Sequence, residues 1–519
     1  MGFMADHKKE SIRTIAAISR TCKRMRFEGT KYLLSGTVEL GLIKDICSFC
    51  RFMLADRSSR LPLLKSLVLR LYSLEEEDHV GLVCEVLRGL SNLWKLDVTL
   101  DVNASPLVIS AVPAAIASLT SLRVLRLFEL GTSICPKPGD QIFVTALRNA
   151  RAPLVVLCIW ASPFVDALGA GVRYSRRRDP IFLCSCLRTT LEQLELHGGL
   201  ILVVRHGRTY EYPHLKKLIL PIYSDFMPYL KPFMVSAPHL RDLQFGGTYN
   251  SHTRHRHDED ILRGRIINQT RTAQEWRTTN EVDQEATGTC WSTLDSFKGA
   301  IISAYASGLS CPIARVHLLS TGGRRTTELA MLSIVLTDWR PSFLRLATKV
   351  YRARDYIPLL PSTTSGWAES LETLEIRLNI VDNQFDCARC FHHIGQMLST
   401  LPTTSLRLEF RCVNSRRQDM EDRDPPFDPF VGEECERPGL YRPDAFCYTQ
   451  DELLREDLPQ RMRECMRSAG ALRRMTIAWG RCWTRGPNRV LCVDLDNVPH
   501  VWDRAGDDSD GWGKPDRDW

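Results

Sequence analysis

The side chains best suited to chemistry in this chain are cysteines and histidines that stand close together. Cys387 and Cys390 have the two-residue gap of a zinc ligand pair, and His392 and His393 follow directly. A closed structural zinc site needs four ligands in a rigid loop, whereas this segment runs on into residues 394–398 with the spacing of an amphipathic helix. The pattern favours buried thiols over a metal site.

A second pair, Cys47 and Cys50, has no partner pair at a zinc-finger distance. A thiol redox role would place the pair at a helix start after a strand, which this segment does not indicate. The chain also contains no Gly-x-x-x-x-Gly-Lys-Ser/Thr, His-Glu-x-x-His or Gly-x-Ser-x-Gly sequence. We therefore predict no catalytic, cofactor or metal site, and a protein that is not an enzyme.

The composition is that of a folded protein. Of 519 residues, 44% are hydrophobic and 25% charged, and the net charge is +7. The 18 cysteines are too few and too irregularly spaced for a disulfide scaffold, so they indicate buried thiols in a reducing compartment. With no secretory signal and no apolar run of 18 residues, the sequence predicts a soluble cytoplasmic or nuclear protein without a membrane segment.

The elements that would position any surface come from one repeated phrase, Leu-x-x-Leu-x-Leu. Seven copies begin between residues 64 and 240, mostly near the 20–29-residue spacing of a leucine-rich repeat. The copies begin at Leu64, Leu93, Leu122, Leu154, Leu191, Leu215 and Leu240, and later ones begin at Leu371 and Leu472. Each copy predicts a short strand with two apolar residues facing inward.

One such unit cannot bury its apolar side alone, but stacked units can. Segments between the copies, including residues 78–90, 140–149, 225–235, 388–401 and 451–468, have the spacing of amphipathic helices. We therefore predict an α/β fold: an irregular leucine-rich-repeat solenoid with parallel strands on the concave face and helices outside. Another α/β topology stays open, because buried parallel strands are leucine-rich in any fold, and the Asn or Cys expected after each strand occurs only at Asn379.

Alternation along each strand predicts which side chains face outward on the concave sheet. They are Val68 and Arg70, Asp97 and Thr99, Arg126 and Phe128, Cys158 and Trp160, Glu195 and His197, Ile219 and Pro221, and Gln244 and Gly246. Aromatic residues with a nearby arginine are enriched at binding hot spots. We predict that a target protein binds at Arg126, Phe128, Trp160, Glu195 and His197.

The N-terminal segment carries a basic stripe beside an apolar one. Ile12, Ile15, Ile18, Cys22 and Met25 recur at helical spacing among lysines and arginines. Together with Ser19-Arg20 and Lys23-Arg24, and with a strand-like Gly36-Thr-Val-Glu-Leu40 after it, the segment resembles the second half of an F-box. The leading Leu-Pro segment and first helix of an F-box have no counterpart before Phe3-Met4.

An F-box followed by leucine-rich repeats is similar to the F-box/LRR substrate receptors of Skp-cullin-F-box ubiquitin ligases, particularly the fungal set. The resemblance implies binding of a Skp-family adaptor, and through it a cullin, by Ile15, Ile18, Cys22 and Met25. Two alternatives are a repeat scaffold with no ligase link, in which this helix caps the first repeat, and a degenerate or truncated F-box protein. Nucleic acid is not an expected partner, because no aromatic stacking or recognisable module accompanies the basic residues.

The predicted organisation follows from these observations. It comprises a partial F-box-like cap (1–45), leucine-rich repeats (46–246), a disordered loop insertion (247–290), irregular repeats (291–413), a Pro- and acid-rich loop (414–450), a last helix-strand repeat (451–493) and an acidic Trp-containing tail (494–519).

Overall fold

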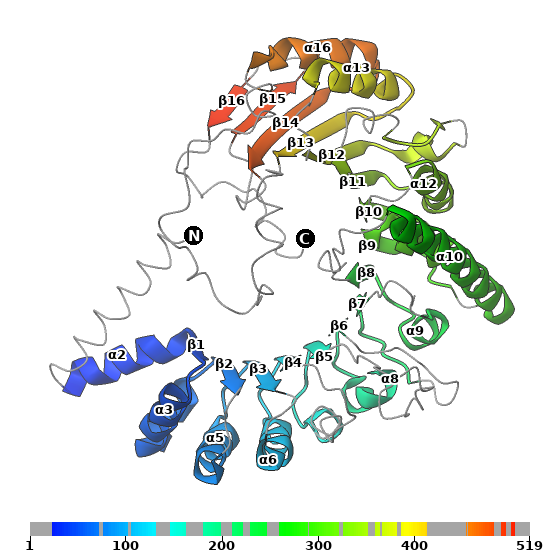
Figure 1. The fold of residues 1–519 in the computed structure, drawn as a ribbon. Coiled ribbons are helices and arrows are strands. Elements are labelled where there is room, and N and C mark those ends of the chain that lie inside the picture. The colour runs from blue at the N-terminus through cyan, green and yellow to red at the C-terminus, as the bar shows by residue number, and fades with distance from the viewer. Residues whose placement is uncertain are drawn as a thin grey trace. The chain divides into compact units, whose positions relative to one another are not determined.

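The computed structural model divides the chain into two compact units, Met1–Tyr223 with Pro228–Gly247, and Ser224–Met227 with Thr248–Trp519. Figure 1 shows the helices and strands of both units. The structure describes residues 23–71, 76–101, 105–130, 146–161, 180–198, 210–221, 229–246, 259–288, 290–320, 325–350, 359–363, 366–380, 386–412, 453, 455–481, 489–494 and 500–503.

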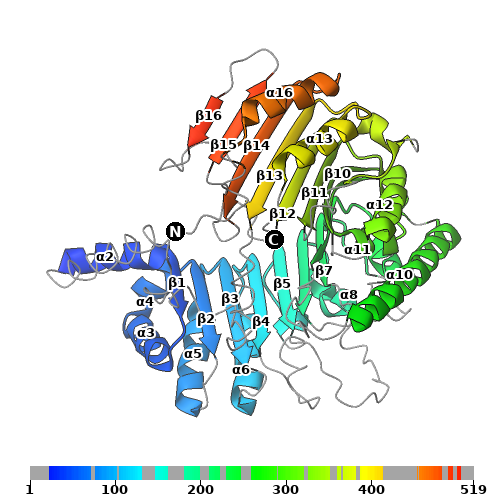
Figure 2. The ribbon, with the colours of Figure 1, turned by 45° about the horizontal axis from the view of Figure 1, so that its top comes forward.

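The first unit contains an open parallel sheet whose strands follow one another in chain order (Figure 2). Every neighbouring pair from β1 to β8 is parallel, so each connection returns the chain to the same end of the sheet. The strands are β1 (Thr37–Leu40), β2 (Ser66–Leu71), β3 (Lys95–Asp101), β4 (Val124–Leu130), β5 (Val156–Ala161), β6 (Gln193–Gly198), β7 (Lys217–Pro221) and β8 (Asp242–Gly246).

The repeated leucines form the core of this unit. Leu67, Leu96, Leu125, Leu157, Leu194, Leu218 and Leu243 stand in one register across the strands and are 0–2% exposed. The prediction that these leucines point into a continuous core is confirmed. The α/β class and the mostly parallel, solenoid-like order of the sheet are confirmed with it.

Helices cover one face of this sheet, and the other carries no helix among the described residues; we call the latter the open face (Figure 1). Helix α5 shows why: its buried residues include Val80, Val83 and Leu87 at helical spacing. The helices are α2 (Lys23–Ser35), α3 (Ile43–Ala55), α4 (Arg57–Arg60), η1 (Leu61–Leu63), α5 (Glu77–Gly89), α6 (Pro106–Ala117), α8 (Pro180–Leu183), η3 (Ser185–Leu187) and α9 (Lys231–Ser236).

Hydrogen bonds at the strand starts tie successive repeats together. The N–H groups of Trp94 and Lys95 both donate to the carbonyl of Lys65, at 3.0 and 3.2 Å, and this arrangement recurs at the following strands. Side chains add a parallel series, in which Asn92 Nδ2 donates to Pro62 O at 2.9 Å and Ser121 Oγ to Leu93 O at 2.8 Å. These bonds lie before the strands, whereas the Asn or Cys of a regular leucine-rich repeat is expected after each strand.

The second unit repeats the arrangement and then reverses it. Strands β9 (Leu294–Ala300), β10 (Ile313–Leu319), β11 (Phe343–Val350), β12 (Thr373–Ile380), β13 (Ser405–Cys412) and β14 (Arg474–Arg481) are parallel. Strands β15 (Arg489–Asp494) and β16 (His500–Asp503) are antiparallel. The region 451–493 is therefore more than one helix-strand repeat, and residues 500–503 of the predicted tail form a strand.

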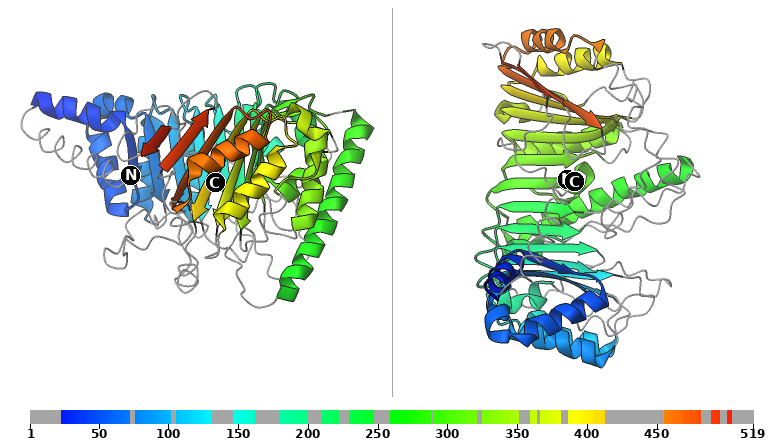
Figure 3. Two further views of the ribbon diagram at one scale, coloured as in Figure 1. Left: turned by 90° about the horizontal axis from the view of Figure 1, so that it is seen from above. Right: turned by 90° about the vertical axis from the view of Figure 1, so that its left-hand side faces the viewer.

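The helices of this unit also lie on one side of its strands (Figure 3). They are α10 (Glu259–Thr287), α11 (Ile301–Ala306), α12 (Arg325–Trp339), η6 (Trp367–Ser370), α13 (Cys387–Leu398) and α16 (Leu458–Ser468). The helices expected at 78–90 and 388–401 correspond to α5 and α13, while α9 and α16 are shorter than expected. Most of the helix expected at 140–149 lies outside the described residues. Among the helices described, none has the length and apolarity needed to cross a membrane.

The prediction of a disordered loop over 247–290 is wrong, because residues 259–287 form the long helix α10. The segment has few large apolar residues, but its amides replace apolar packing. Asn280 Nδ2 donates to Ala306 O at 3.1 Å and Gln284 Nε2 to Gly308 O at 3.0 Å, both buried. These bonds satisfy carbonyls at the end of α11, which a helix leaves without partners.

Helix α10 lies against α11 at a glycine. Gly308 has φ +60°, and a Cβ added there would lie 2.9 Å from the carbonyl oxygen of Arg277 in α10. We expect Gly308→Ala to lower the free energy of unfolding by at least about 1–3 kcal/mol from backbone strain alone, and to expose the amides of α10 to hydrogen exchange.

Gly288 provides the matched control for this substitution, because it has φ +59° with nothing within 4 Å of an added Cβ. Gly288→Ala should show the backbone strain, with loss of protection limited to the last turn of α10, which Gly288 follows. Equal protection of α10 in the two variants would contradict the close helix contact.

The predicted N-terminal cap lies partly outside the described residues. Ile15, Ile18 and Cys22 belong to the undescribed part; Met25 lies in α2, and its side chain is not described. The strand expected at residues 36–40 is present as β1.

Candidate functional site

The predicted target-binding residues lie on three neighbouring strands of the open face of the first unit. Arg126, Cys158 and Glu195 are in register on β4, β5 and β6. Phe128, Trp160 and His197 form the next row in the same order. Because alternate side chains of a strand share a face, the sheet brings all five predicted residues together and adds Cys158.

The second row is a stack of rings. The ring centroids of Phe128 and Trp160 are 6.5 Å apart with the planes tilted by 33°, and those of Trp160 and His197 are 5.0 Å apart and nearly parallel at 20°. Aromatic pairs at such distances attract one another beyond the area that they bury. The row therefore presents a fixed aromatic surface.

A cluster of titratable groups lies beside this stack. His197 Nε2 is 3.6 Å from Glu195 Oε2, and Gln193 Nε2 donates a hydrogen bond to Glu195 Oε1. Burial alone would raise the pKa of Glu195, but the hydrogen bonds from His197 and Gln193 outweigh it and the pKa is lowered. Burial and the Glu195 carboxylate raise the pKa of the Cys158 thiol.

Arg126 adjoins a second half-buried carboxylate, that of Asp97. Asp97 is its in-register neighbour on β3, and Lys95 Nζ lies 3.5 Å from Asp97 Oδ2. Burial raises the pKa of Asp97 against the opposing effect of Lys95 and Arg126. Asp97 Oδ1 and Arg126 Nε are buried and have no hydrogen-bond partner among the described residues. Because such atoms cost free energy when unpaired, this edge of the cluster favours a polar partner.

Some of the side chains that were predicted to face outward on the sheet are covered by their neighbours. Thr99, Cys158 and Ile219 are 3–5% exposed, and Pro221 is also buried. Strands lie about 4.8 Å apart, so a short side chain is covered by larger neighbours in its row. Sequence reasoning left Cys158 and Gln193 out of the site, although their alternation with Trp160 and Glu195 places them on the same face.

The cysteine pairs behave as expected from the sequence. Cys47 and Cys50 are buried in α3, and Cys387 and Cys390 are buried in α13. Burial raises the pKa of Cys50 to about 12 and that of Cys390 well above its usual value, so these thiols are protonated at neutral pH. Within the described residues, the one group of three metal-ligating side chains that lie within 4.8 Å is Cys158, Glu195 and His197.

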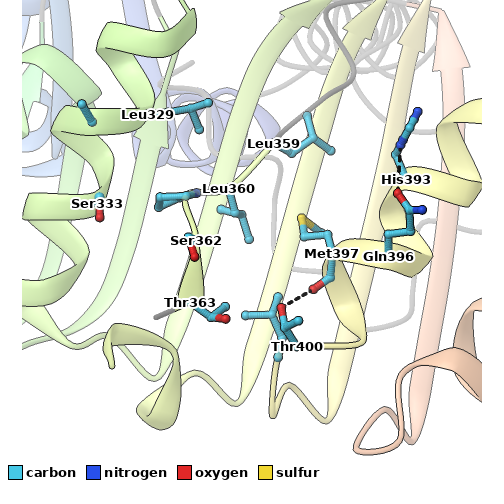
Figure 4. A pocket seen from close by; sticks show the side chains of 13 residues that line it. Leu329, Ser333, Leu359, Leu360, Ser362, Thr363, His393, Gln396, Met397 and Thr400 are labelled. Atoms are coloured by element: carbon cyan, nitrogen blue, oxygen red, sulfur yellow. Dashed lines mark hydrogen bonds between the residues drawn. The ribbon is translucent and has the colours of Figure 1, made fainter. Parts of the chain in front are cut away.

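A groove of about 610 Å³ lies between α12 and α13 in the second unit (Figure 4). Its lining is mostly apolar and includes Leu329, Leu359 and Met397. The imidazole of His393 contacts Gln396 Oε1 at 3.3 Å, and the described lining residues include no carboxylate or thiol beside it. The groove therefore offers apolar contacts without a pair of groups for acid-base chemistry.

In the second unit, the face of the sheet opposite its helices carries a charged network on β11, β12 and β13. Glu409 accepts from Arg377 Nε at 2.9 Å and from Arg411 Nε at 2.8 Å. Arg345 Nε lies 3.2 Å from Glu375 Oε2 and Arg345 Nη2 3.9 Å from Glu409 Oε2. The side chain of Glu409 is 6% exposed, so its charge depends on these arginines.

In comparisons with known proteins, no protein-family model and no curated protein sequence matches the chain.

Proposed function

We propose that the protein is a leucine-rich-repeat receptor that binds a protein target on the open face of its first unit. The observation that carries the proposal is the two-row patch of Arg126, Phe128, Trp160, Glu195 and His197, which combines stacked rings with charged groups. Interface hot spots are enriched in aromatic residues and arginine. Adjacent repeats supply these side chains from rigid strands, which lowers the entropy lost on binding.

The adaptor link is the finer part of this proposal. We propose that the protein serves as the substrate-recognition subunit of a Skp-cullin-F-box ubiquitin ligase, with Ile15, Ile18, Cys22 and Met25 contacting the adaptor. The F-box-like sequence before a leucine-rich body supports it, as does the predicted strand at 36–40, which is present as β1. A repeat scaffold without a ligase link is the alternative.

Target capture tests the patch. The full-length protein should capture target proteins from cell extract. The amount captured should fall in each of the variants Arg126→Ala, Phe128→Ala and Trp160→Ala. A hot-spot side chain contributes about 2 kcal/mol or more, so each loss should be roughly 30-fold or greater. The matched control is Trp94→Ala, because Trp94 is 46% exposed in the same unit and lies before β3. Unchanged capture by all three variants would show that the target binds elsewhere on the protein.

Adaptor binding tests the ligase link separately. Purified full-length protein should retain a Skp-family adaptor at micromolar concentration, and Ile15→Asp with Ile18→Asp should abolish the retention by placing charge on the apolar stripe. Target capture should survive this double substitution. If the unsubstituted protein ignores the adaptor but still captures a target, the scaffold alternative holds.

A further inference from the structure

The open face of the first unit brings a thiol, a carboxylate and an imidazole together. Glu195 and His197 are two residues apart on β6 and share a face, and Cys158 is the in-register neighbour of Glu195 on β5. One ligand atom from each lies within 4.8 Å of the other two. These are the three side-chain types that hold Zn²⁺ in proteins.

The distances suit a tetrahedral ion. Zn–N and Zn–O bonds of about 2.0–2.1 Å and a Zn–S bond of about 2.3 Å separate neighbouring ligand atoms by roughly 3.3–3.6 Å. His197 Nε2 and Glu195 Oε2 are already 3.6 Å apart. Cys158 Sγ lies within 4.8 Å of a ligand atom of each of these two residues, so a single ion can reach all three side chains.

The residues around the three groups hold them in position. Gln193 donates to the Glu195 carboxylate, and the Trp160 ring stacks on the His197 imidazole. Metal ligands are commonly fixed by such outer contacts. Gly246 lies close to the His197 imidazole, because a Cβ added at Gly246 would lie 3.8 Å from His197 Cε1 and Nδ1. The same Cβ would lie 3.3 Å from Ile219 Cγ2.

An ion pair between Glu195 and His197 explains only part of this arrangement. It needs no third group, yet the 4% exposed Cys158 stands against the same carboxylate. A thiol facing a carboxylate and an imidazole is the donor set of a soft or borderline divalent ion, and it disfavours Mg²⁺ and Ca²⁺, which prefer oxygen ligands.

We propose that Cys158, Glu195 and His197 bind one divalent cation of the zinc class. Three protein ligands leave a fourth position for water or a donor atom of a bound molecule. The thiol loses its proton when the metal–sulfur bond forms, and the proton passes to solvent. The proposal goes beyond target binding and does not depend on it, because the metal binds the free protein.

Cobalt substitution tests the site in the full-length, untagged protein. We expect one equivalent of Co²⁺ to give a thiolate-to-cobalt charge-transfer band and tetrahedral d–d bands, which one equivalent of Zn²⁺ abolishes. Cys158→Ser should remove the charge-transfer band, and His197→Gln should remove stoichiometric binding. Gln193→Met keeps the size of the side chain but removes the hydrogen bond to Glu195. It should weaken the affinity for Co²⁺ by about 10–100-fold.

The control is Cys186→Ser, an exposed cysteine of the same unit whose Sγ donates to Leu147 O at 2.7 Å, a bond that a hydroxyl can also make. Its cobalt spectrum should equal that of the unsubstituted protein. The proposal is overturned if the unsubstituted protein shows no charge-transfer band, or if the band persists in Cys158→Ser. Target capture is a different assay, so its failure leaves this result unaffected.

Discussion

Glu409→Gln is expected to lower the free energy of unfolding by about 3–5 kcal/mol, because it removes the buried anion that pairs with Arg377 and Arg411. Glu409 is 5% exposed and is bonded by Arg377 and Arg411. Without its charge, the guanidinium groups remain desolvated and repel one another. Urea unfolding of the unsubstituted protein and the variant at pH 7 measures the difference.

The pH dependence of this difference identifies its cause. Burial would raise the pKa of Glu409, but the charges of Arg377 and Arg411 outweigh it and the pKa in the folded protein is lowered. A lowered carboxyl pKa gives stability that is present above the unfolded-state value of about 4.3 and is lost as pH falls through the folded-state value. The gap between the two proteins should therefore narrow below about pH 4.

Glu192→Gln is the matched control, because Glu192 forms an exposed pair with Lys216 at 3.1 Å, with side chains 46% and 53% exposed. Surface pairs of this kind contribute at most about 1 kcal/mol. A loss for Glu409→Gln no larger than this, or one that does not change with pH, would contradict a buried ionic network.

Leu96→Ala should cost about 2–5 kcal/mol, because it empties a position that is 0% exposed in the middle of the leucine core. In a stacked fold each repeat contacts only its neighbours. Hydrogen exchange read by mass spectrometry should therefore show faster exchange in β2, β3 and β4, and little change in β7 and β8.

Trp94→Ala is the control for Leu96→Ala, because it removes a large side chain that is not part of the core. Trp94 precedes Leu96 by two residues but is 46% exposed, so its removal should change stability by less than about 1 kcal/mol. Uniform acceleration of exchange through the unit in Leu96→Ala would contradict nearest-neighbour stacking.

The fold was largely predictable because the leucine phrase fixes both the strand position and its inward face. Leu96 and Leu125 were identified from spacing alone and stand side by side in the core. Helix α10 was missed because its contacts depend on amides. Asn280 and Gln284 give no apolar periodicity, and their partners are the carbonyls of Ala306 and Gly308, more than 20 residues further along the chain. The bonds before each strand were missed for a similar reason, since hydroxyl and amide residues such as Ser121 and Asn92 also suit a loop.

The site was predictable in position but not in chemistry. Alternation placed Glu195 and His197 on one face, and the ring stack followed from aligned repeats. The closeness of Cys158 to both depends on the register between β5 and β6, and the 37-residue interval between those two copies of the phrase does not determine it.

The reversal of chain direction after β14 has an evolutionary consequence. Where all strands are parallel, a repeat can be duplicated or deleted in the gene, and the strands on either side of it can still pair in parallel. After β14 the next strand, β15, runs antiparallel. A repeat added between β14 and β15 would therefore have to pair in parallel on one side and antiparallel on the other, and these two pairings have different hydrogen-bond patterns. Gain and loss of repeats in descendants of this gene should therefore fall before β14, with the β14–β16 segment inherited as one piece.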